Sequence, residues 1–286
     1  MKKTGIGIGA ALLAIGLILF YLGWSTPSLS ENYGKIDTHL YLSDSASQPL
    51  IVAFGGGSGG NDWERNYLKE KRDEFLARGF AVLAIGYFNS GQSPNTLDRI
   101  SLNAISDSVL QIAKRHPQVD TSRLILMGAS KGGELVLNLA SRYSHFKGVI
   151  ALSTSHVSFP AHTLAANTSS WQYNNREIPY VPAPLTTLVP ALKGNLYEAF
   201  TLMLKDKNAV HPAEIEVENI NGPILLLSGT QDEQWPATHM SEQLIIRLAK
   251  HKFKHRYQHL AFKGGHVEPL NHFDKVFEFL EEEFKK

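Results

Sequence analysis

The chain has 286 residues, of which 43% are hydrophobic, and its formal net charge is +1. A chain of this length and composition can bury one large core, so we expect one main domain. The balanced charge gives no indication of a nucleic-acid partner. The sequence contains no cysteine, which excludes disulfides, thiolate metal ligands and a cysteine nucleophile.

The first element in chain order is an apolar segment, Gly5 to Trp24, which carries no charged residue and follows Lys2 and Lys3. A bilayer-spanning helix needs about 20 apolar residues, and this segment is long enough. The preceding lysines favour a cytoplasmic amino end, which places the rest of the chain on the exported side. We therefore expect residues 1–30 to be a single-pass membrane anchor and tether, with a periplasmic or extracellular main domain. A cleaved signal peptide, which would give a secreted protein beginning near Glu31, is the alternative.

The remainder of the chain, residues 31–286, alternates strand-like and helix-like segments. Short apolar or alternating runs typical of strands lie at 36–42, 50–54, 80–85, 124–127, 149–152, 224–227 and 255–262. Helix-like segments lie at 63–78, 100–112, from 131 onward, at 240–248 and at 273–280. Strands that alternate with helices at these spacings predict βαβ units, and therefore an α/β fold with a mainly parallel sheet flanked by helices.

One stretch, residues 155–221, breaks this alternation because it is rich in proline and aromatic residues. Long loops in compact domains usually serve a function. We expect this stretch to be a lid-like or cap-like insertion over the substrate. Its candidate substrate-covering side chains are Trp171, Tyr173 and Tyr180. A surface excursion packed on its own aromatic residues is the alternative.

The strand at 124–127 runs into Gly128-Ala129-Ser130-Lys131-Gly132, which fits the G-x-S-x-G pattern of a nucleophile elbow. A serine hydroxyl is a weak nucleophile near neutral pH, so it needs both an exposed position and a base. A sharp strand-to-helix turn provides the exposure, and the helix that follows directs free N–H groups toward a developing oxyanion. We predict that Ser130 is a nucleophile. An ordinary turn with an incidental serine is the alternative.

Residues 130–134, SKGGE, also resemble the elbow of the acyl-CoA thioesterase and bile acid-CoA:amino acid N-acyltransferase family, in its C-terminal catalytic domain. The segments 169–182, 222–236 and 264–266 resemble the same domain in the same order. The resemblance covers most of residues 50–275 and implies an α/β-hydrolase fold.

A catalytic serine needs a base, and the base needs an orienting acid. In this fold the acid and the base follow the serine along the chain, in loops after late strands. Asp232 follows the strand at 224–227, and His266 follows the last strand in a Gly-Gly-His triplet. The resemblance assigns the acid to Asp232 rather than to its neighbour Glu233. We therefore predict a triad of Ser130, Asp232 and His266.

A glycine-rich run, residues 55–60, directly follows the strand at 50–54. It lacks the spacing of the known phosphate-binding loops. Its position matches the α/β-hydrolase loop that lends a backbone N–H to the oxyanion hole. We predict oxyanion donors at the backbone of Lys131 and of Gly56 or Gly57. The Lys131 side chain is expected to be solvated, with attraction of an anionic substrate as the alternative.

These residues together predict a serine hydrolase that cleaves an ester or thioester of an acyl group through an acyl-enzyme, with no metal and no cofactor. His251, His255 and His259 are expected on different elements and form no helical metal-binding pair. In the family, cysteine at the nucleophile position goes with acyl transfer to an amine, and serine with hydrolysis. The animal enzymes of this family carry a β-sandwich domain ahead of the catalytic one, whereas only a tether and one expected strand precede Leu50 here. If that sandwich helps to recognise a CoA-linked substrate, the resemblance does not imply CoA specificity.

Three other functions stay open at this point. One is an exported peptidase on the same fold, resembling the prolyl oligopeptidase group. Another is an acyltransferase with an amine acceptor. The third is a membrane-tethered binding protein on a hydrolase scaffold that has lost its activity. A peptidase and an esterase would use the same triad, so the site residues do not distinguish them. A panel of acyl esters and peptides does.

Overall fold

The computed structural model describes residue 16 and residues 25–285. Apart from Gly16, the predicted membrane anchor at Gly5 to Trp24 lies outside the described residues. Within the part of the chain that is described, no helix is both long and apolar enough to cross a membrane.

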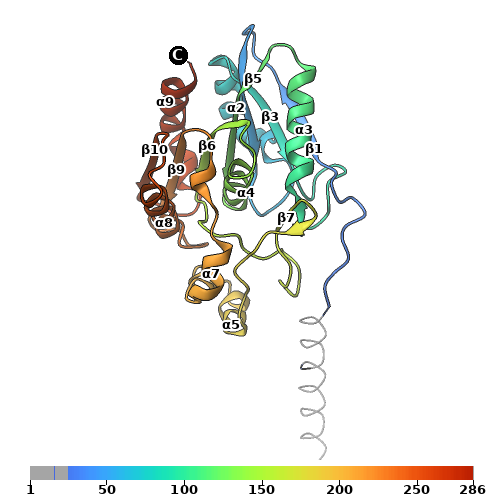
Figure 1. Ribbon diagram of the computed structural model, residues 1–286, viewed down its shortest axis with the longest axis vertical. Helices are drawn as coiled ribbons and strands as arrows, with labels where there is room; N and C mark the ends of the chain where they lie inside the picture. The colour runs from blue at the N-terminus through green and yellow to red at the C-terminus, as the bar shows by residue number, and fades with distance from the viewer. Residues whose placement is uncertain (1–15, 17–24, 286) are drawn as a thin grey trace, which may run out of the picture.

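The described chain is organised around a seven-stranded sheet with the order β1-β3-β2-β5-β6-β9-β10 (Figure 1). β1 pairs antiparallel with β3, and the other neighbouring pairs in this sheet are parallel. The predicted α/β class and the mainly parallel sheet are therefore confirmed. The strands are β1 (Asp37–Tyr41), β2 (Gln48–Phe54), β3 (Ala81–Gly86), β5 (Val119–Ala129), β6 (Phe146–Leu152), β9 (Ile224–Gly229) and β10 (Tyr257–Phe262).

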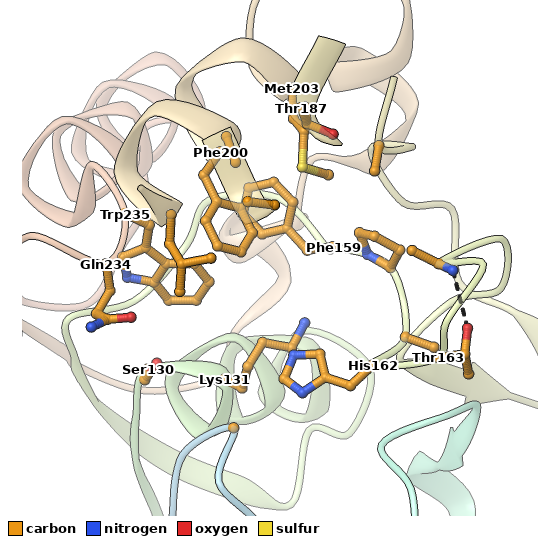
Figure 2. A pocket seen from close by; sticks show the side chains of 18 of the residues that line it. Ser130, Lys131, Phe159, His162, Thr163, Thr187, Phe200, Met203, Gln234 and Trp235 are labelled. Carbon is orange, nitrogen blue, oxygen red and sulfur yellow. Dashed lines mark hydrogen bonds between the residues drawn. The ribbon is translucent and has the colours of Figure 1, made fainter. Parts of the chain in front are cut away.

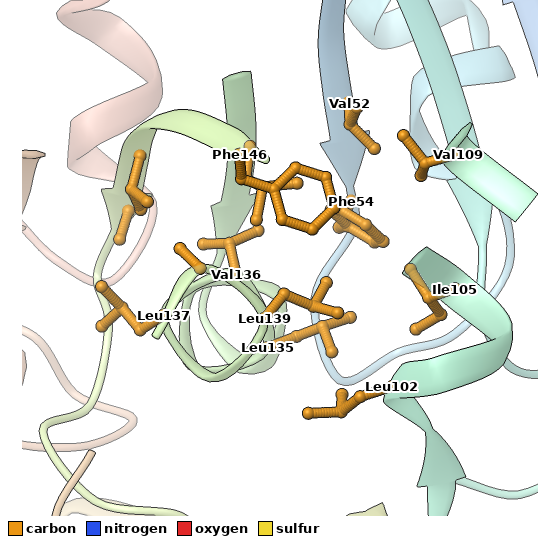
Figure 3. Packing of buried hydrophobic residues seen from close by; sticks show 14 of the residues in the cluster. Val52, Phe54, Leu102, Ile105, Val109, Leu135, Val136, Leu137, Leu139 and Phe146 are labelled. Carbon is orange, nitrogen blue, oxygen red and sulfur yellow. The ribbon is translucent and has the colours of Figure 1, made fainter. Parts of the chain in front are cut away.

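Helices cover both faces of this sheet, which explains why its central strands are apolar on both sides. The helices are α2 (Lys69–Ala77), α3 (Leu102–Arg115), α4 (Lys131–Ala140), α8 (Ala237–Lys250) and α9 (Phe273–Phe284). In β2, Leu50 and Val52 pack with residues of α3, α4 and α8, whereas Ile51 and Ala53 pack with residues of α2 and α9. Figure 3 shows α3 beside α4, with Ile105 of α3 and Leu139 of α4 in the same cluster as Phe54 of β2. The two-residue alternation of the strand thus builds one hydrophobic cluster on each face.

The insertion at 155–221 is more regular than the sequence indicated. It contains α5 (Leu188–Leu192), α6 (Leu196–Met203), α7 (Lys207–Ala213), β7 (Trp171–Tyr173) and β8 (Arg176–Glu177). β7 and β8 join β4 (Ile100–Ser101) in a second, three-stranded sheet. The helices were missed because they are short, and because Pro190 lies in α5 and Pro212 in α7. Elements this short do not sustain a readable helical period.

Two further boundaries differ from the prediction. Ile100, expected at the start of a helix, lies in β4, and α3 begins at Leu102. The segment expected as one helix from residue 63 starts with two short 3₁₀ turns before α2. The 3₁₀ segments of the described chain are η1 (Asp62–Glu64), η2 (Asn66–Leu68), η3 (Leu185–Thr187), η4 (Val217–Asn219) and η5 (Glu268–Asn271).

Candidate active site

Ser130 occupies a sharp turn between β5 and α4, with φ +56° and ψ −121°. A positive φ is uncommon for a residue other than glycine and is a form of strain that recurs at functional sites. The flanking glycines are required by close backbone approach. A Cβ at Gly128 would lie 2.2 Å from the carbonyl oxygen of Gly132, and a Cβ at Gly132 would lie 2.2 Å from that of Gly55. The G-x-S-x-G pattern is therefore a packing requirement of this turn.

The predicted acid and base are in direct contact. Asp232 follows β9 and His266 follows β10, and Asp232 Oδ2 lies 2.7 Å from His266 Nδ1. The other carboxylate oxygen, Oδ1, accepts hydrogen bonds from the backbone N–H groups of Gln234 at 2.8 Å and Trp235 at 3.1 Å. Because a carboxylate can only accept, Nδ1 carries the proton and a neutral His266 keeps its lone pair on Nε2.

Three more contacts fix the position of His266. Its backbone N–H donates to Glu233 Oε2 at 3.0 Å, and its carbonyl accepts from Ser153 Oγ at 2.7 Å. Its ring packs edge-on against Trp235, whose Nε1–H donates to the carbonyl of Ser153 at 3.0 Å. The hydrogen bond from His266 is the largest cause of the lowered pKa of the Glu233 carboxyl. Glu233 thus holds the histidine loop, while Asp232 holds the ring.

Ser153 was not predicted from the sequence, although it supports both His266 and Trp235. It directly follows β6 and has a φ of +44°. A serine after a buried strand is too common to stand out. Only the structure shows that its hydroxyl and its carbonyl bond two different residues of the site.

Ser130 and His266 both line a cavity of about 710 Å³ (Figure 2). Three aromatic rings face Ser130 across this cavity, and we call them the aromatic wall: Phe159, Phe200 and Trp235. Their ring centroids lie 4.7 Å apart for Phe159–Phe200, 5.4 Å for Phe200–Trp235 and 5.7 Å for Phe159–Trp235. An apolar wall of this kind suits an acyl chain or another apolar group.

The predicted oxyanion loop passes beside Ser130. A Cβ at Gly56 would lie 3.4 Å from the Cβ of Ser130, and Gly57 lines the cavity. The Tyr87 hydroxyl lies 3.1 Å from the carbonyl oxygen of Gly55 and 3.0 Å from that of Gly56. In trans peptides the N–H points opposite to the preceding carbonyl, so the N–H groups of Gly56 and Gly57 point away from Tyr87. Their role as oxyanion donors stays a prediction.

The expectation of a solvated Lys131 side chain is wrong. Lys131 is 4% exposed, and its Nζ donates to both carboxylate oxygens of Glu134 at 2.9 Å. Burial lowers the pKa of Lys131 and raises that of Glu134, and each group opposes the shift of the other. Glu134 Oε1 also accepts from Trp171 Nε1 at 2.6 Å and from the N–H of Phe159 at 3.0 Å. The lysine charge is therefore neutralised within α4 and offers no free cation to an anionic substrate.

The three aromatic residues predicted to cover the substrate do not line the cavity. Trp171 is fully buried in the main core, since the pairing of β7 with β4 draws it into the domain. Tyr173 packs edge-on against Tyr143, with ring centroids 5.7 Å apart. Tyr180 is half-buried elsewhere in the insertion. The insertion instead contributes Phe159 and Phe200 to the cavity.

His162 is a cavity residue that the sequence analysis did not single out. It lies on the same side of the cavity as Ser130 and Lys131 (Figure 2). Its protein surroundings lower its pKa to about 4, because of burial and the nearby Lys131 charge, partly offset by a hydrogen bond to the backbone of Gly57. His162 is therefore neutral near pH 7. One histidine among 12 gave no signal in the sequence.

The histidines weighed as metal ligands lie apart in the fold. His251 follows the end of α8, His255 lies in the turn before β10, and His259 lies on β10 with Nε2 2.8 Å from Ser228 Oγ. Among residues 25–285, no group of three or more histidine, aspartate or glutamate side chains is arranged to hold a metal ion.

A serine elbow, followed by acid and base loops at the carboxyl edge of a mainly parallel sheet, defines the α/β-hydrolase class. Solved structures share this fold. The acylaminoacyl peptidase of Pyrococcus horikoshii matches with a TM-score of 0.61 and 16% identity, over 92% of this chain and 41% of that one. An acetyl xylan esterase from Paenibacillus sp. R4 matches with a TM-score of 0.55 and 16% identity, over 87% and 80%. At these identities the likeness shows the fold alone.

Within that class, residues 107–270 match the family described as BAAT / Acyl-CoA thioester hydrolase C terminal. The chain is 30% identical over 243 residues to the mitochondrial acyl-coenzyme A thioesterase 2 of Mus musculus, covering 82% of this chain and 49% of the relative. It is 29% identical over 246 residues to acyl-coenzyme A thioesterase 1 of Mus musculus, covering 82% and 53%. The chain therefore belongs to this family, and the predicted resemblance is confirmed. It spans about half the length of these relatives.

Proposed function

We propose that this protein is a serine hydrolase that cleaves an acyl ester or thioester, with Ser130 as nucleophile and His266 as base. The observation that carries the proposal is the 2.7 Å contact between His266 Nδ1 and Asp232 Oδ2, in a base that shares a cavity with Ser130. The relatives are named as acyl-coenzyme A thioesterases, which supports a thioester as the substrate class.

The reaction proceeds in two half-reactions. His266 Nε2 takes the hydroxyl proton as Ser130 Oγ attacks the acyl carbonyl carbon, and Asp232 stabilises the imidazolium that forms. The backbone N–H of Lys131 and one N–H of the 56–58 loop hold the oxyanion. His266 then protonates the departing alcohol or thiol as its bond to the acyl carbon breaks. A water molecule, deprotonated by His266, attacks the acyl-enzyme and releases the carboxylic acid and Ser130.

The cavity supports an apolar acyl group as the part of the substrate that is recognised. The aromatic wall lies across the cavity from Ser130, so an acyl chain bound along it has its carbonyl end near the nucleophile (Figure 2). The buried pair of Lys131 and Glu134 places no unpaired charge beside the serine. Serine in place of cysteine favours hydrolysis over transfer to an amine.

A substrate panel tests this proposal. The full chain is assayed with p-nitrophenyl esters and thioesters of increasing chain length, beside acylated peptides and an amine acceptor. We expect hydrolysis of the acyl compounds and nearly complete loss of it in Ser130→Ala. Full turnover by Ser130→Ala would refute the assignment of the nucleophile, and cleavage of peptides alone would identify a peptidase instead.

We also propose that residues 1–30 anchor the protein in a membrane, with the hydrolase domain, residues 31–286, on the exported side. The uncharged segment from Gly5 to Trp24 and the preceding Lys2 and Lys3 support this topology. A reporter fused after Lys286 should be active only on the exported side. Activity of the fusion in the cytoplasm would overturn this topology, and mature protein beginning near Glu31 would identify a cleaved signal peptide.

A further inference from the structure

The insertion carries large apolar side chains on its solvent-exposed surface, which we call the apolar rim. Its members and exposed fractions are Leu164 (86%), Leu185 (82%), Leu188 (43%), Val189 (58%) and Leu192 (78%). The last four recur at three- and four-residue intervals through η3 and α5 and therefore share one side of this short helical stretch. Contiguous exposed apolar residues of this kind mark interaction sites.

The apolar rim borders the candidate active site. Thr187 and Ala191, which alternate with the rim residues along the same turns, line the cavity. In the neighbouring loop, Thr163 and Ala166 line the cavity on either side of Leu164. The same short segments thus present one side to the cavity and the other, apolar side to the surroundings.

The amino-terminal tether is fastened beside this rim. The carbonyl of Ser25 accepts a hydrogen bond from Asn167 Nδ2 at 2.9 Å, and Asn167 lies three residues after Leu164. The carbonyl of Pro27 accepts from Arg99 Nη2 at 2.6 Å. Figure 1 shows α5 and the first residues of the tether toward the same end of the molecule, opposite the carboxyl terminus. The uncharged segment that ends at Trp24 is therefore joined to the domain next to the cavity.

We propose that the apolar rim rests on a lipid bilayer and that the cavity takes its acyl substrate from that bilayer. The inference rests on the proposed hydrolase function and on the proposed membrane anchor. Asn167 bonds Ser25, the residue that follows Trp24. If the anchor ends at Trp24, the bilayer surface therefore lies close to Asn167, because each residue spans at most about 3.6 Å. Apolar side chains at that level enter the interfacial region, as those of surface-bound amphipathic helices do. The exposed Lys193, directly after α5, suits the polar headgroup layer, where its ammonium group stays hydrated.

A second copy of this chain, or a soluble protein partner, would also cover apolar side chains. Neither would account for the attachment of the tether beside the same rim. A bilayer accounts for both, and it supplies the class of substrate that the aromatic wall fits. That class is an amphiphilic ester or thioester whose acyl chain passes from the lipid phase into the cavity. The carbonyl group of this substrate then lies at Ser130.

The absence of native cysteine permits a direct test of the contact with lipid. Single variants Leu164→Cys, Leu188→Cys and Leu192→Cys of the full chain are labelled with a nitrobenzoxadiazole dye and reconstituted in phosphatidylcholine vesicles. The matched control is Ile246→Cys, which replaces an apolar residue of α8 that is 57% exposed and lies outside the rim. We expect lipid-borne nitroxide quenchers to quench the rim labels, and aqueous iodide to quench the control.

Two outcomes overturn the proposal. Rim labels that iodide quenches as strongly as the control would show that the rim faces water. Rim labels that are protected from both quenchers, with protection lost when the protein is diluted in the vesicles, would show that a second copy covers the rim.

A functional arm separates this inference from the hydrolase proposal. The double variant Leu188→Ser/Leu192→Ser should lose about tenfold or more of its turnover on a long-chain ester held in vesicles, since two exposed leucines that would enter the bilayer are removed. Its turnover of water-soluble p-nitrophenyl acetate should be unchanged. Equal turnover of the vesicle-held ester by the variant and the parent would overturn the inference. Absence of any ester hydrolysis by the parent would refute the hydrolase proposal but leave the quenching result standing.

Discussion

The two sides of the cavity are built by different means. On the sheet side, Gly128 and Gly132 flank Ser130 where backbone segments touch, and Cβ atoms added there would collide with carbonyl oxygens. On the insertion side, Phe159 and Phe200 are held mainly by ring-to-ring packing among side chains. Backbone contact permits few substitutions, whereas side-chain packing accepts many residues of similar volume. The turn that carries Ser130 is therefore specified tightly by sequence, and the aromatic wall is specified loosely.

Glu134 joins the two sides. From α4 it binds Lys131 beside the nucleophile, and it accepts hydrogen bonds from Phe159 of the aromatic wall and from Trp171 of β7. One buried carboxylate thus fixes the insertion against the elbow. The comparison predicts that changes on the sheet side abolish the chemistry, that changes at Glu134 loosen the domain, and that changes in the wall alter substrate preference.

The largest effect is expected at the acid. Asp232→Asn should reduce kcat by roughly 10⁴-fold, as in the serine-protease case, because the amide favours the wrong tautomer of His266. Steady-state kinetics with a short-chain ester measure the loss, and circular dichroism verifies that the variant is folded. A loss below about tenfold in a folded variant would remove Asp232 from the triad. Glu233→Gln is the control, since its carboxylate bonds the backbone of His266 and not the ring.

The next largest effect is expected on stability. Glu134→Gln leaves the buried Lys131 without a counter-charge, and breaking a buried ion pair in this way costs about 3–5 kcal/mol. Urea unfolding of the variant and the parent measures the difference in free energy of unfolding. The double variant Lys131→Met/Glu134→Gln should recover part of it, because no charge is then left unpaired. An unaltered free energy of unfolding in Glu134→Gln would show that the pair does not hold the two sides together.

The free energy of unfolding should fall in acid because of His156, a buried residue at the start of the insertion. Burial lowers its pKa from 6.5 to about 3, with smaller contributions from His239 and Lys207. In the unfolded chain, His156 therefore binds a proton as the pH falls through about 6.5, whereas in the folded chain it stays neutral until the pH nears 3. This contribution to stability is complete above that pH and is lost as the pH falls toward 3. Between about pH 7.5 and about pH 4.5 the expected loss is about 3 kcal/mol.

Urea unfolding at both pH values measures this loss, and His156→Leu is the matched variant. Its free energy of unfolding should depend less on pH than that of the parent, by about the same 3 kcal/mol. An identical pH dependence in the parent and the variant would count against a neutral, buried His156.

The smallest effect is expected in the wall. Phe200→Ala removes one ring of the aromatic wall, which should raise KM for long-chain esters by about 10- to 100-fold while kcat for p-nitrophenyl acetate stays close to that of the parent. Tyr180→Phe, which changes a residue of the same insertion away from the cavity, should alter both substrates by less than about twofold. A larger change in Tyr180→Phe than in Phe200→Ala would restore the sequence-based choice of covering residues.

This contrast also explains what the sequence could predict. The positions of the main strands along the chain, the elbow around Ser130 and the loops that carry Asp232 and His266 could be predicted, because each depends on a local pattern. Gly128 and Gly132 are forced by backbone contact, so a motif records them. The family resemblance also rested on these segments, and it proved correct.

The rest depended on contacts between distant segments. Trp171 looked like a substrate-covering aromatic residue, yet its strand pairs with β4 some seventy positions earlier in the chain. Lys131 was expected to be solvated, yet it pairs with the buried Glu134. The burial of Glu134 depends on Phe159 and Trp171, which lie far along the chain and donate hydrogen bonds to it. Phe200 lies in α6, a helix of only eight residues, in a stretch that resembled a loop because of its prolines. In the first two cases the deciding interaction lies far away in the sequence.

The central claim is that Ser130 is a nucleophile activated by His266, and covalent labelling tests it most directly. The full chain is treated with a fluorophosphonate, and the adduct is located by peptide mass spectrometry. We predict one adduct, on Ser130, none at that position in Ser130→Ala, and labelling slower by about 10²-fold or more in His266→Ala. An adduct on a different residue, or equal labelling rates in the parent and His266→Ala, would contradict the account.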